Sequence, residues 1–210
     1  KFLEKLEIFD MPRLEIPELS KSNKNRWGKC NTLTSAYGHG VSTTLLQLTR
    51  AYAAIVNGGV LLDSSILFNS KLNKKRVISK ETSAIMNQML RANVDKKNKT
   101  SGSGRKADIS GYDVLGKTGT AQKPSKKEKG YSKEILNVFA SAFPSKKPKY
   151  ILTVLIDEPK GAPLIWKHSR REAGWNAVYI AGKIIQKIGP SLAINDLDLL
   201  NNYASHTKNN

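Results

Sequence analysis

The sequence predicts an α+β domain in which helices flank an antiparallel sheet. Apolar residues recur at helical spacing in the first half of the chain, and three strand-like runs follow one another in the second half. A helical pattern then returns near the C-terminus. Helices that come before and after a group of consecutive strands are typical of the α+β class.

The first half is expected to contain three helices, covering residues 1–9, about 42–57 and about 79–94. The first would be the end of an amphipathic helix. Ser42 or Thr43 would cap the second helix, and Asn57–Gly59 would end it. Ser79 would cap the third. Two short strands are expected between the second and third helices, at residues 60–62 and 66–68.

The main sheet is expected from three segments, residues 112–120, 137–143 and 150–156. The turn-forming residues Phe143–Pro148 lie between the last two, which predicts an antiparallel hairpin. A last helix should span about Trp175 to Ile188 and end at Gly189–Pro190. Residues 1–200 would form one folded portion, and residues 201–210 a polar tail.

The 210-residue chain carries a formal net charge of +18, but its basic residues are scattered over polar loops without interleaved aromatic residues. We therefore expect solvated loops and no nucleic-acid partner. No run of 18 apolar residues is present, so no membrane-spanning helix is predicted. Cys30 is the only cysteine and has no histidine at helical spacing, so neither an internal disulfide nor a metal site at this cysteine is predicted.

A four-residue motif in the first strand of the main sheet carries the chemistry: Lys117, Thr118, Gly119 and Thr120. A strand at the edge of a cleft can hold an extended peptide by backbone pairing, and glycine lets that peptide come close. The lysine offers a positive charge to a carboxylate or to a proton-transfer network. The two threonines offer hydroxyl donors to a carboxylate.

The surroundings of the motif resemble those of the class B penicillin-binding proteins, the D,D-transpeptidases that cross-link peptidoglycan. Gly116 precedes the motif, Ala121 and Gln122 follow it, and the runs Tyr37–Gly40 and Asn57–Gly59 complete the likeness, which is greatest to division-type enzymes. The resemblance implies an incomplete β-lactamase/transpeptidase-like fold. It also implies that Lys117 and Thr120 are catalytic, with the N–H of Thr120 in the oxyanion hole, and that Thr118, Gly119 and Thr120 bind substrate.

The same family requires a nucleophilic serine in Ser-x-x-Lys and a further Ser-x-Asn motif. Ser-x-Asn does not occur, and Ser-x-x-Lys occurs only at Ser103 and Ser205. Ser103 lies in a glycine-rich segment close before Lys117, and Ser205 follows Lys117 in the polar tail, so neither is expected to be the nucleophile. We expect both motifs upstream of residue 1, and this chain alone to be inactive.

The resemblance implies a parent enzyme that acts on D-Ala-D-Ala stem peptides through an acyl-serine and binds β-lactams, and it implies no metal or organic cofactor. It further implies the periplasmic side of the bacterial inner membrane, an anchor outside this chain, and divisome or cell-wall synthase partners. Two alternatives stay open. One is a D,D-carboxypeptidase or serine β-lactamase-like hydrolase, and the other is a non-catalytic scaffold or a module that binds anionic polymers.

Overall fold

The computed structural model describes residues 2–17, 28–36, 38, 40–98, 102–125, 130–166 and 169–207. Its centre is a three-stranded sheet in the order β3-β4-β5, with both pairs antiparallel. The strands are β3 (Leu115–Pro124), β4 (Tyr131–Phe143) and β5 (Tyr150–Asp157). The α+β class and the hairpin between the last two strands are confirmed. The first strand begins at Leu115 rather than at residue 112, because Gly111 and Tyr112 form a turn.

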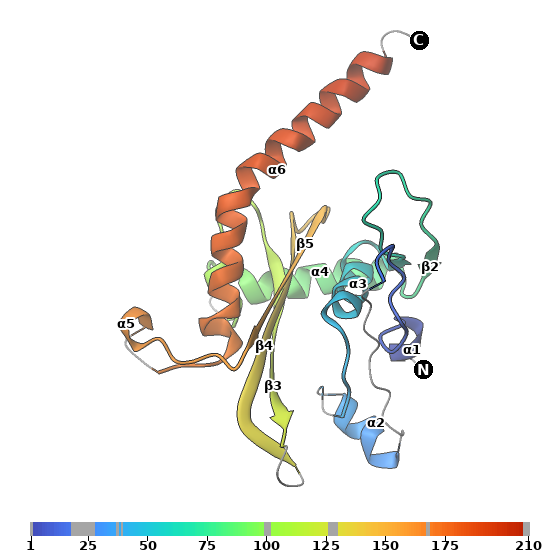
Figure 1. Cartoon of the computed structure of the whole chain (residues 1–210). Coiled ribbons are helices and arrows are strands. Elements are labelled where there is room, and N and C mark those ends of the chain that lie inside the picture. The colour runs from blue at the N-terminus through green and yellow to red at the C-terminus, as the bar shows by residue number, and fades with distance from the viewer. Residues whose placement is uncertain are drawn as a thin grey trace.

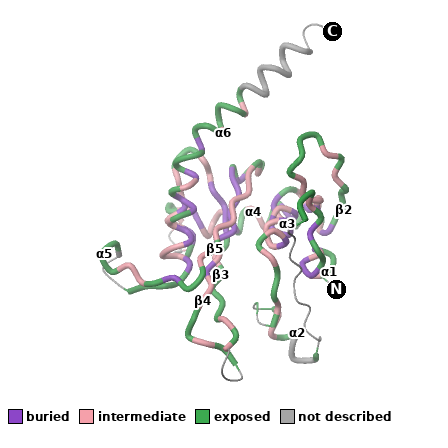
Figure 2. The backbone as a smooth tube through the Cα atoms, in the orientation of Figure 1, coloured by how far each residue is buried: buried purple, intermediate pink, exposed green. Residues whose placement is uncertain are grey.

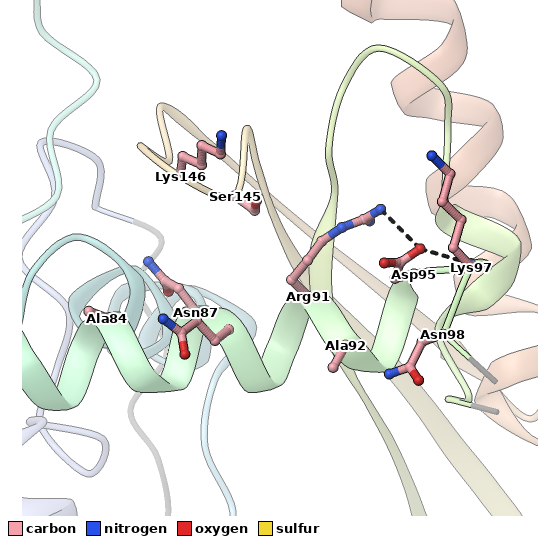
Figure 3. A pocket seen from close by; sticks show the side chains of 10 residues that line it. Ala84, Asn87, Arg91, Ala92, Asp95, Lys97, Asn98, Ser145 and Lys146 are labelled. Carbon is pink, nitrogen blue, oxygen red and sulfur yellow. Dashed lines mark hydrogen bonds and ion pairs between the residues drawn. The ribbon is translucent and has the colours of Figure 1, made fainter. Parts of the chain in front are cut away.

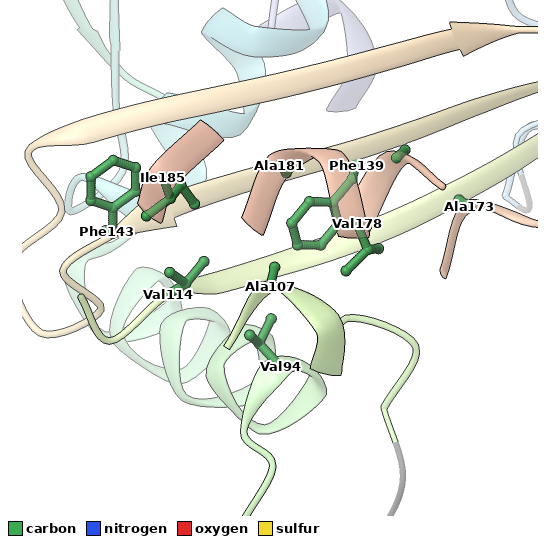
Figure 4. Close-up of a cluster of buried hydrophobic side chains, with 10 residues drawn as sticks. Val94, Ala107, Val114, Phe139, Phe143, Ala173, Val178, Ala181 and Ile185 are labelled. Carbon is green, nitrogen blue, oxygen red and sulfur yellow. The ribbon is translucent and has the colours of Figure 1, made fainter. Parts of the chain in front are cut away.

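Helices cover both faces of this sheet (Figure 1). Alternate residues of β4 face opposite ways. Phe139 and Phe143 are buried against α6 (Ala177–Thr207), and Figure 4 shows them beside Val178 and Ile185 of that helix. Ala140 and Ala142 belong to the other face, in a cluster to which α3 (Leu45–Val56) and α4 (Lys80–Val94) contribute.

The helix caps follow ordinary N-cap chemistry. Ser79 caps α4 as predicted, because its hydroxyl accepts a hydrogen bond from the N–H of Thr82 at 3.1 Å. The predicted cap of α3 was wrong. Thr44, not Ser42 or Thr43, accepts from the N–H of Gln47, while the Thr43 hydroxyl donates to the carbonyl of Ile8.

The N-terminal segment packs on the far side of α3 together with β1 (Val60–Leu62), which pairs antiparallel with β2 (Lys74–Arg76). The predicted helix over residues 1–9 was wrong beyond its first turn, since α1 covers only Phe2–Lys5. Residues 6–9 form a turn whose apolar side chains Leu6, Ile8 and Phe9 are buried. The expected strand at residues 66–68 is also absent, because these residues form a bend and turn.

The remaining elements are short: α2 (Lys29–Ser35), α5 (Pro163–Trp166) and the 3₁₀ helices η1 (Arg105–Ala107) and η2 (Ala173–Trp175). None of the described helices is both long and apolar enough to cross a membrane.

The last helix contradicts the prediction most clearly. Instead of ending at Gly189–Pro190, α6 continues to Thr207 and projects from the body of the molecule, and residues 191–197 are mostly exposed (Figures 1 and 2). Tertiary contacts outweigh the hydrogen bond that a helical proline removes. Leu192 packs against the core, and Asp196 accepts from the Tyr150 hydroxyl and pairs with Lys149, both at 2.9 Å.

Candidate functional site

The predicted motif lies on β3, which forms an edge of the three-stranded sheet in the described part of the chain. Two main-chain carbonyl groups of β3 accept hydrogen bonds from side chains. The carbonyl of Gly116 accepts from Asn93 Nδ2 at 2.8 Å, and that of Thr118 accepts from Lys117 Nζ at 2.9 Å. Backbone groups of an antiparallel strand point alternately to one side and the other. The backbone groups of residues 116, 118 and, by the same alternation, 120 therefore point away from β4.

The two threonine side chains lie on the face of β3 that also carries η2. Thr118 Oγ1 is 2.6 Å from Ser103 Oγ, and Thr120 Oγ1 accepts from the N–H of Ala173 at 3.3 Å. A hydroxyl that accepts a hydrogen bond still carries its own proton. Thr120 therefore retains the ability to donate to a ligand from this position. The structure places Lys117, Gly119 and the two threonines within one short stretch of exposed or half-buried strand.

Two glycines of β3 meet very different surroundings. A Cβ atom added to Gly116 would lie 2.5 Å from Cζ of the buried Phe139, so packing explains this glycine. A Cβ atom added to Gly119 would meet nothing closer than Val138 Cβ at 4.0 Å. Neither glycine has a positive φ. Nothing in the described chain requires glycine at 119, and the space beside it is open.

Asn93, near the end of α4, was missed by sequence reasoning. Its Oδ1 accepts from the N–H of Ser103 at 3.1 Å, and its main-chain carbonyl accepts from the N–H of Gly104 at 3.2 Å. A Cβ atom at Gly102 would lie 1.9 Å from that carbonyl oxygen, so the turn needs glycine there. Together with its bond to Gly116, Asn93 joins α4, the glycine-rich turn and β3. The sequence analysis noted the glycine-rich segment around Ser103, but no pattern in the sequence indicated that it packs against α4.

Ser103 remains a poor candidate for the nucleophile, as its context predicted. It lies in a turn before η1 and not at the start of an α-helix. Lys106, which would have to assist it, places its Nζ 3.8 Å from the centre of the Trp175 ring. The side chain of Ser205 lies outside the described residues. Within the described residues, no group of three or more His, Cys, Asp or Glu is placed to hold a metal ion.

A separate cavity of about 680 Å³ runs along α4 and the β4–β5 turn (Figure 3). It contains none of the motif residues. Arg91 lines it and holds the chain just before β3, with ion pairs of 2.9 Å to Asp108 and Asp113 and a 2.6 Å hydrogen bond to the Val114 carbonyl. This cluster supports the position of β3 from outside the motif.

Comparison with known proteins identifies the fold and the family. The sequence model described as the penicillin binding protein transpeptidase domain matches residues 1–186. A Caulobacter vibrioides protein named "Probable peptidoglycan D,D-transpeptidase FtsI" is 32% identical over 94% of this chain and 34% of its own length. Stage V sporulation protein D of Bacillus subtilis is 32% identical over 80% of this chain and 26% of its own length.

Solved structures agree with these relatives. Penicillin binding protein 3 of Mycobacterium tuberculosis, complexed with ampicillin, superposes with a TM-score of 0.76 at 27% identity, covering 90% of this chain and 45% of that one. The transpeptidase domain of Burkholderia pseudomallei penicillin-binding protein 3 gives 0.72 at 25% identity, covering 89% and 56%. This chain spans about a third of the length of the Caulobacter vibrioides protein and about a quarter of that of stage V sporulation protein D. The chain belongs to the penicillin-binding protein transpeptidase domain family.

Proposed function

We propose that the full-length protein is a peptidoglycan D,D-transpeptidase that cross-links stem peptides through an acyl-serine and binds β-lactams. The observation that carries the proposal is the placement of Lys117–Thr120 on the open edge of β3, within the fold of the transpeptidase family. Ser-x-Asn does not occur in this chain, and the two Ser-x-x-Lys matches, at Ser103 and Ser205, lack the expected context, so we infer that the nucleophilic serine and its lysine lie outside these 210 residues.

Each motif residue has a proposed role in binding or acylation. The hydroxyl groups of Thr118 and Thr120 would donate to the terminal carboxylate of D-Ala-D-Ala, or to the carboxylate of a β-lactam. The open space beside Gly119 would admit the substrate backbone to the strand edge. The ammonium of Lys117 would act on the substrate carboxylate or on the proton-transfer network of the serine.

The N–H of Thr120 would form one half of the oxyanion hole. Backbone alternation supports this, because it directs that N–H away from β4 and into the open edge. A donor of this kind lowers the barrier by about 3 kcal/mol when it is aimed at the developing oxyanion. The second donor would be the N–H of the nucleophilic serine itself.

The wider setting follows from the family resemblance alone. The protein would be anchored in the bacterial inner membrane by a segment outside this chain, and its transpeptidase domain would face the periplasm. Its partners would be divisome or other cell-wall synthase proteins. The folded portion would comprise residues 1–200. The helix α6 continues past residue 200, to Thr207, into the segment predicted as a polar tail.

Labelling by a fluorescent penicillin tests the proposed activity. The full-length protein should become covalently labelled, and the 210-residue chain should not. Lys117→Ala in the full-length protein should slow acylation at least tenfold, which is about 1.4 kcal/mol in the barrier. Lys147→Ala, at an exposed lysine in the β4–β5 turn, is the matched control and should acylate normally. A full-length protein that takes no label, or a loss below tenfold in Lys117→Ala, would contradict the respective assignment.

A further inference from the structure

A second, strongly cationic pocket lies directly beside the threonines of β3. It has a volume of about 380 Å³ and lies between the glycine-rich turn with η1 on one side and the segment that enters η2 on the other. Three cationic side chains and one carboxylate line it, along with an indole ring, a hydroxyl and two glycines: Arg105, Lys106, Arg170, Glu172, Trp175, Ser103, Gly102 and Gly174. The excess of positive charge favours an anionic ligand.

Two of these cations gather around one aromatic ring. Lys106 Nζ lies 3.8 Å from the centre of the Trp175 ring, and Arg170 Cζ lies 5.5 Å from it. Burial lowers the pKa of Lys106 below its ordinary value, which means that the ammonium has lost part of its hydration. A carboxylate entering the pocket would compensate for that lost hydration with a charge-assisted hydrogen bond.

The pocket adjoins the proposed substrate site. Ser103, which lines the pocket, has its Oγ 2.6 Å from Thr118 Oγ1. Ala173, next to Gly174 of the pocket wall, donates its N–H to Thr120 Oγ1. Residues in or next to the pocket wall therefore contact both threonine hydroxyls.

The chemistry of acyl transfer indicates which molecule would continue there. In a two-step mechanism, the D-Ala leaving group departs before the second substrate arrives. The amine of the acceptor then attacks the ester carbonyl from the position that the D-Ala amine has left. A new amide C–N bond forms, the ester C–O bond to serine breaks, and the amine proton returns to the serine oxygen. The leaving D-Ala ends at its carboxylate, whereas the acceptor is a whole stem peptide and must extend past the threonines.

We propose that this pocket is the acceptor subsite, in which Lys106 and Arg170 bind a carboxylate of the acceptor stem peptide. The inference rests on the proposed transpeptidase function and deepens it. It provides a physical reason for the acyl-enzyme to react with an amine rather than with water, because a held acceptor has a high effective concentration at the ester.

The test measures how the acyl-enzyme partitions between transfer and hydrolysis in the full-length protein. A thioester analogue of the donor peptide forms the acyl-enzyme, and two acceptor stem peptides compete with water, one with free carboxylates and one with carboxamides. In the double variant Lys106→Met/Arg170→Gln, transfer to the carboxylate acceptor should fall about tenfold, or about 1.4 kcal/mol. Transfer to the carboxamide acceptor and the rate of labelling by a fluorescent penicillin should stay within about twofold, because neither needs an anion in this pocket.

Two further variants separate charge from packing. Lys106→Arg keeps the cation beside Trp175 and should retain transfer to the carboxylate acceptor. Lys146→Met/Lys147→Gln removes two exposed lysines of the β4–β5 turn and should change nothing. Equal losses with both acceptors, no loss in the double variant, or a loss in donor acylation would overturn the acceptor subsite. A wild-type protein that takes no penicillin label would instead refute the proposed function.

Discussion

Replacing Gly119 by alanine should separate the folding role of a glycine in β3 from a substrate-binding role. The added methyl group would meet nothing closer than 4.0 Å, and the backbone φ is compatible with alanine. A glycine-to-alanine change at such a position stabilises a protein by about 0.4–1 kcal/mol, through the unfolded chain. Gly119→Ala should therefore fold at least as well as the wild type. Acylation by penicillin should nevertheless slow at least tenfold, because the methyl group takes space that the substrate backbone needs.

Gly116→Ala is the matched control on the same strand. Its methyl group would lie 2.5 Å from Phe139 Cζ and 2.9 Å from the Ala140 carbonyl oxygen, so the buried ring must shift. Overpacking of this kind costs about 1–3 kcal/mol. Urea unfolding of the full-length protein and the second-order rate of labelling by fluorescent penicillin measure the two effects. If Gly119→Ala acylates within twofold of the wild type, or is destabilised as much as Gly116→Ala, the assignment of Gly119 to substrate approach is wrong.

Three other predictions follow from particular contacts. Asn93→Ala loses its side-chain hydrogen bonds to Gly116 and Ser103 and should lower the free energy of unfolding by about 2 kcal/mol in urea titrations, whereas a change below about 0.5 kcal/mol would contradict its bridging role. Phe139→Ala leaves a cavity in the hydrophobic cluster between the sheet and α6, and it should lower the free energy of unfolding by about 3–5 kcal/mol in the same titrations. The hydrogen bond from Lys149 lowers the pKa of Asp196. The stabilisation that the Asp196 carboxylate gives to α6 is therefore complete above the ordinary aspartate pKa and disappears as the pH falls through the lowered value. Below about pH 4, hydrogen exchange in α6 beyond Pro190 should therefore accelerate relative to Asp196→Asn, and an equal response in both proteins would refute this anchor.

The sequence predicted those parts of the fold whose signals are local. Ser79 marked the start of α4 because a capping hydroxyl acts on an N–H three residues away. The turn after Phe143 indicated the β4–β5 hairpin because it connects neighbouring strands. Pro190 misled the prediction, since the contacts of Leu192 and Asp196 that hold α6 together beyond it come from the distant residues around β5.

The candidate site, like the fold, could be predicted only where its residues are close together in the sequence. The motif from Lys117 to Thr120 could be found because its residues are adjacent in the chain. Its supports could not, because Asn93 and Ser103 reach β3 across 23 and 15 positions of sequence. The cationic pocket could not be predicted from the sequence either, because Lys106 and Arg170 come together around Trp175 only in the folded chain.

The way β3 is held explains how an edge strand can remain open. Exposed edges invite pairing with other strands, so proteins usually cover or interrupt them. In the described part of the chain, side-chain hydrogen bonds rather than a fourth strand connect β3 to α4 and η2, with Asn93 at the Gly116 carbonyl and Thr120 at the N–H of Ala173. On this edge the Gly116 carbonyl accepts from Asn93 and the Thr118 carbonyl accepts from Lys117 Nζ, while the backbone groups of Thr120 remain directed toward whatever binds there. That arrangement suits an extended peptide with a terminal carboxylate, because its backbone can pair with β3 while its carboxylate reaches the two threonines.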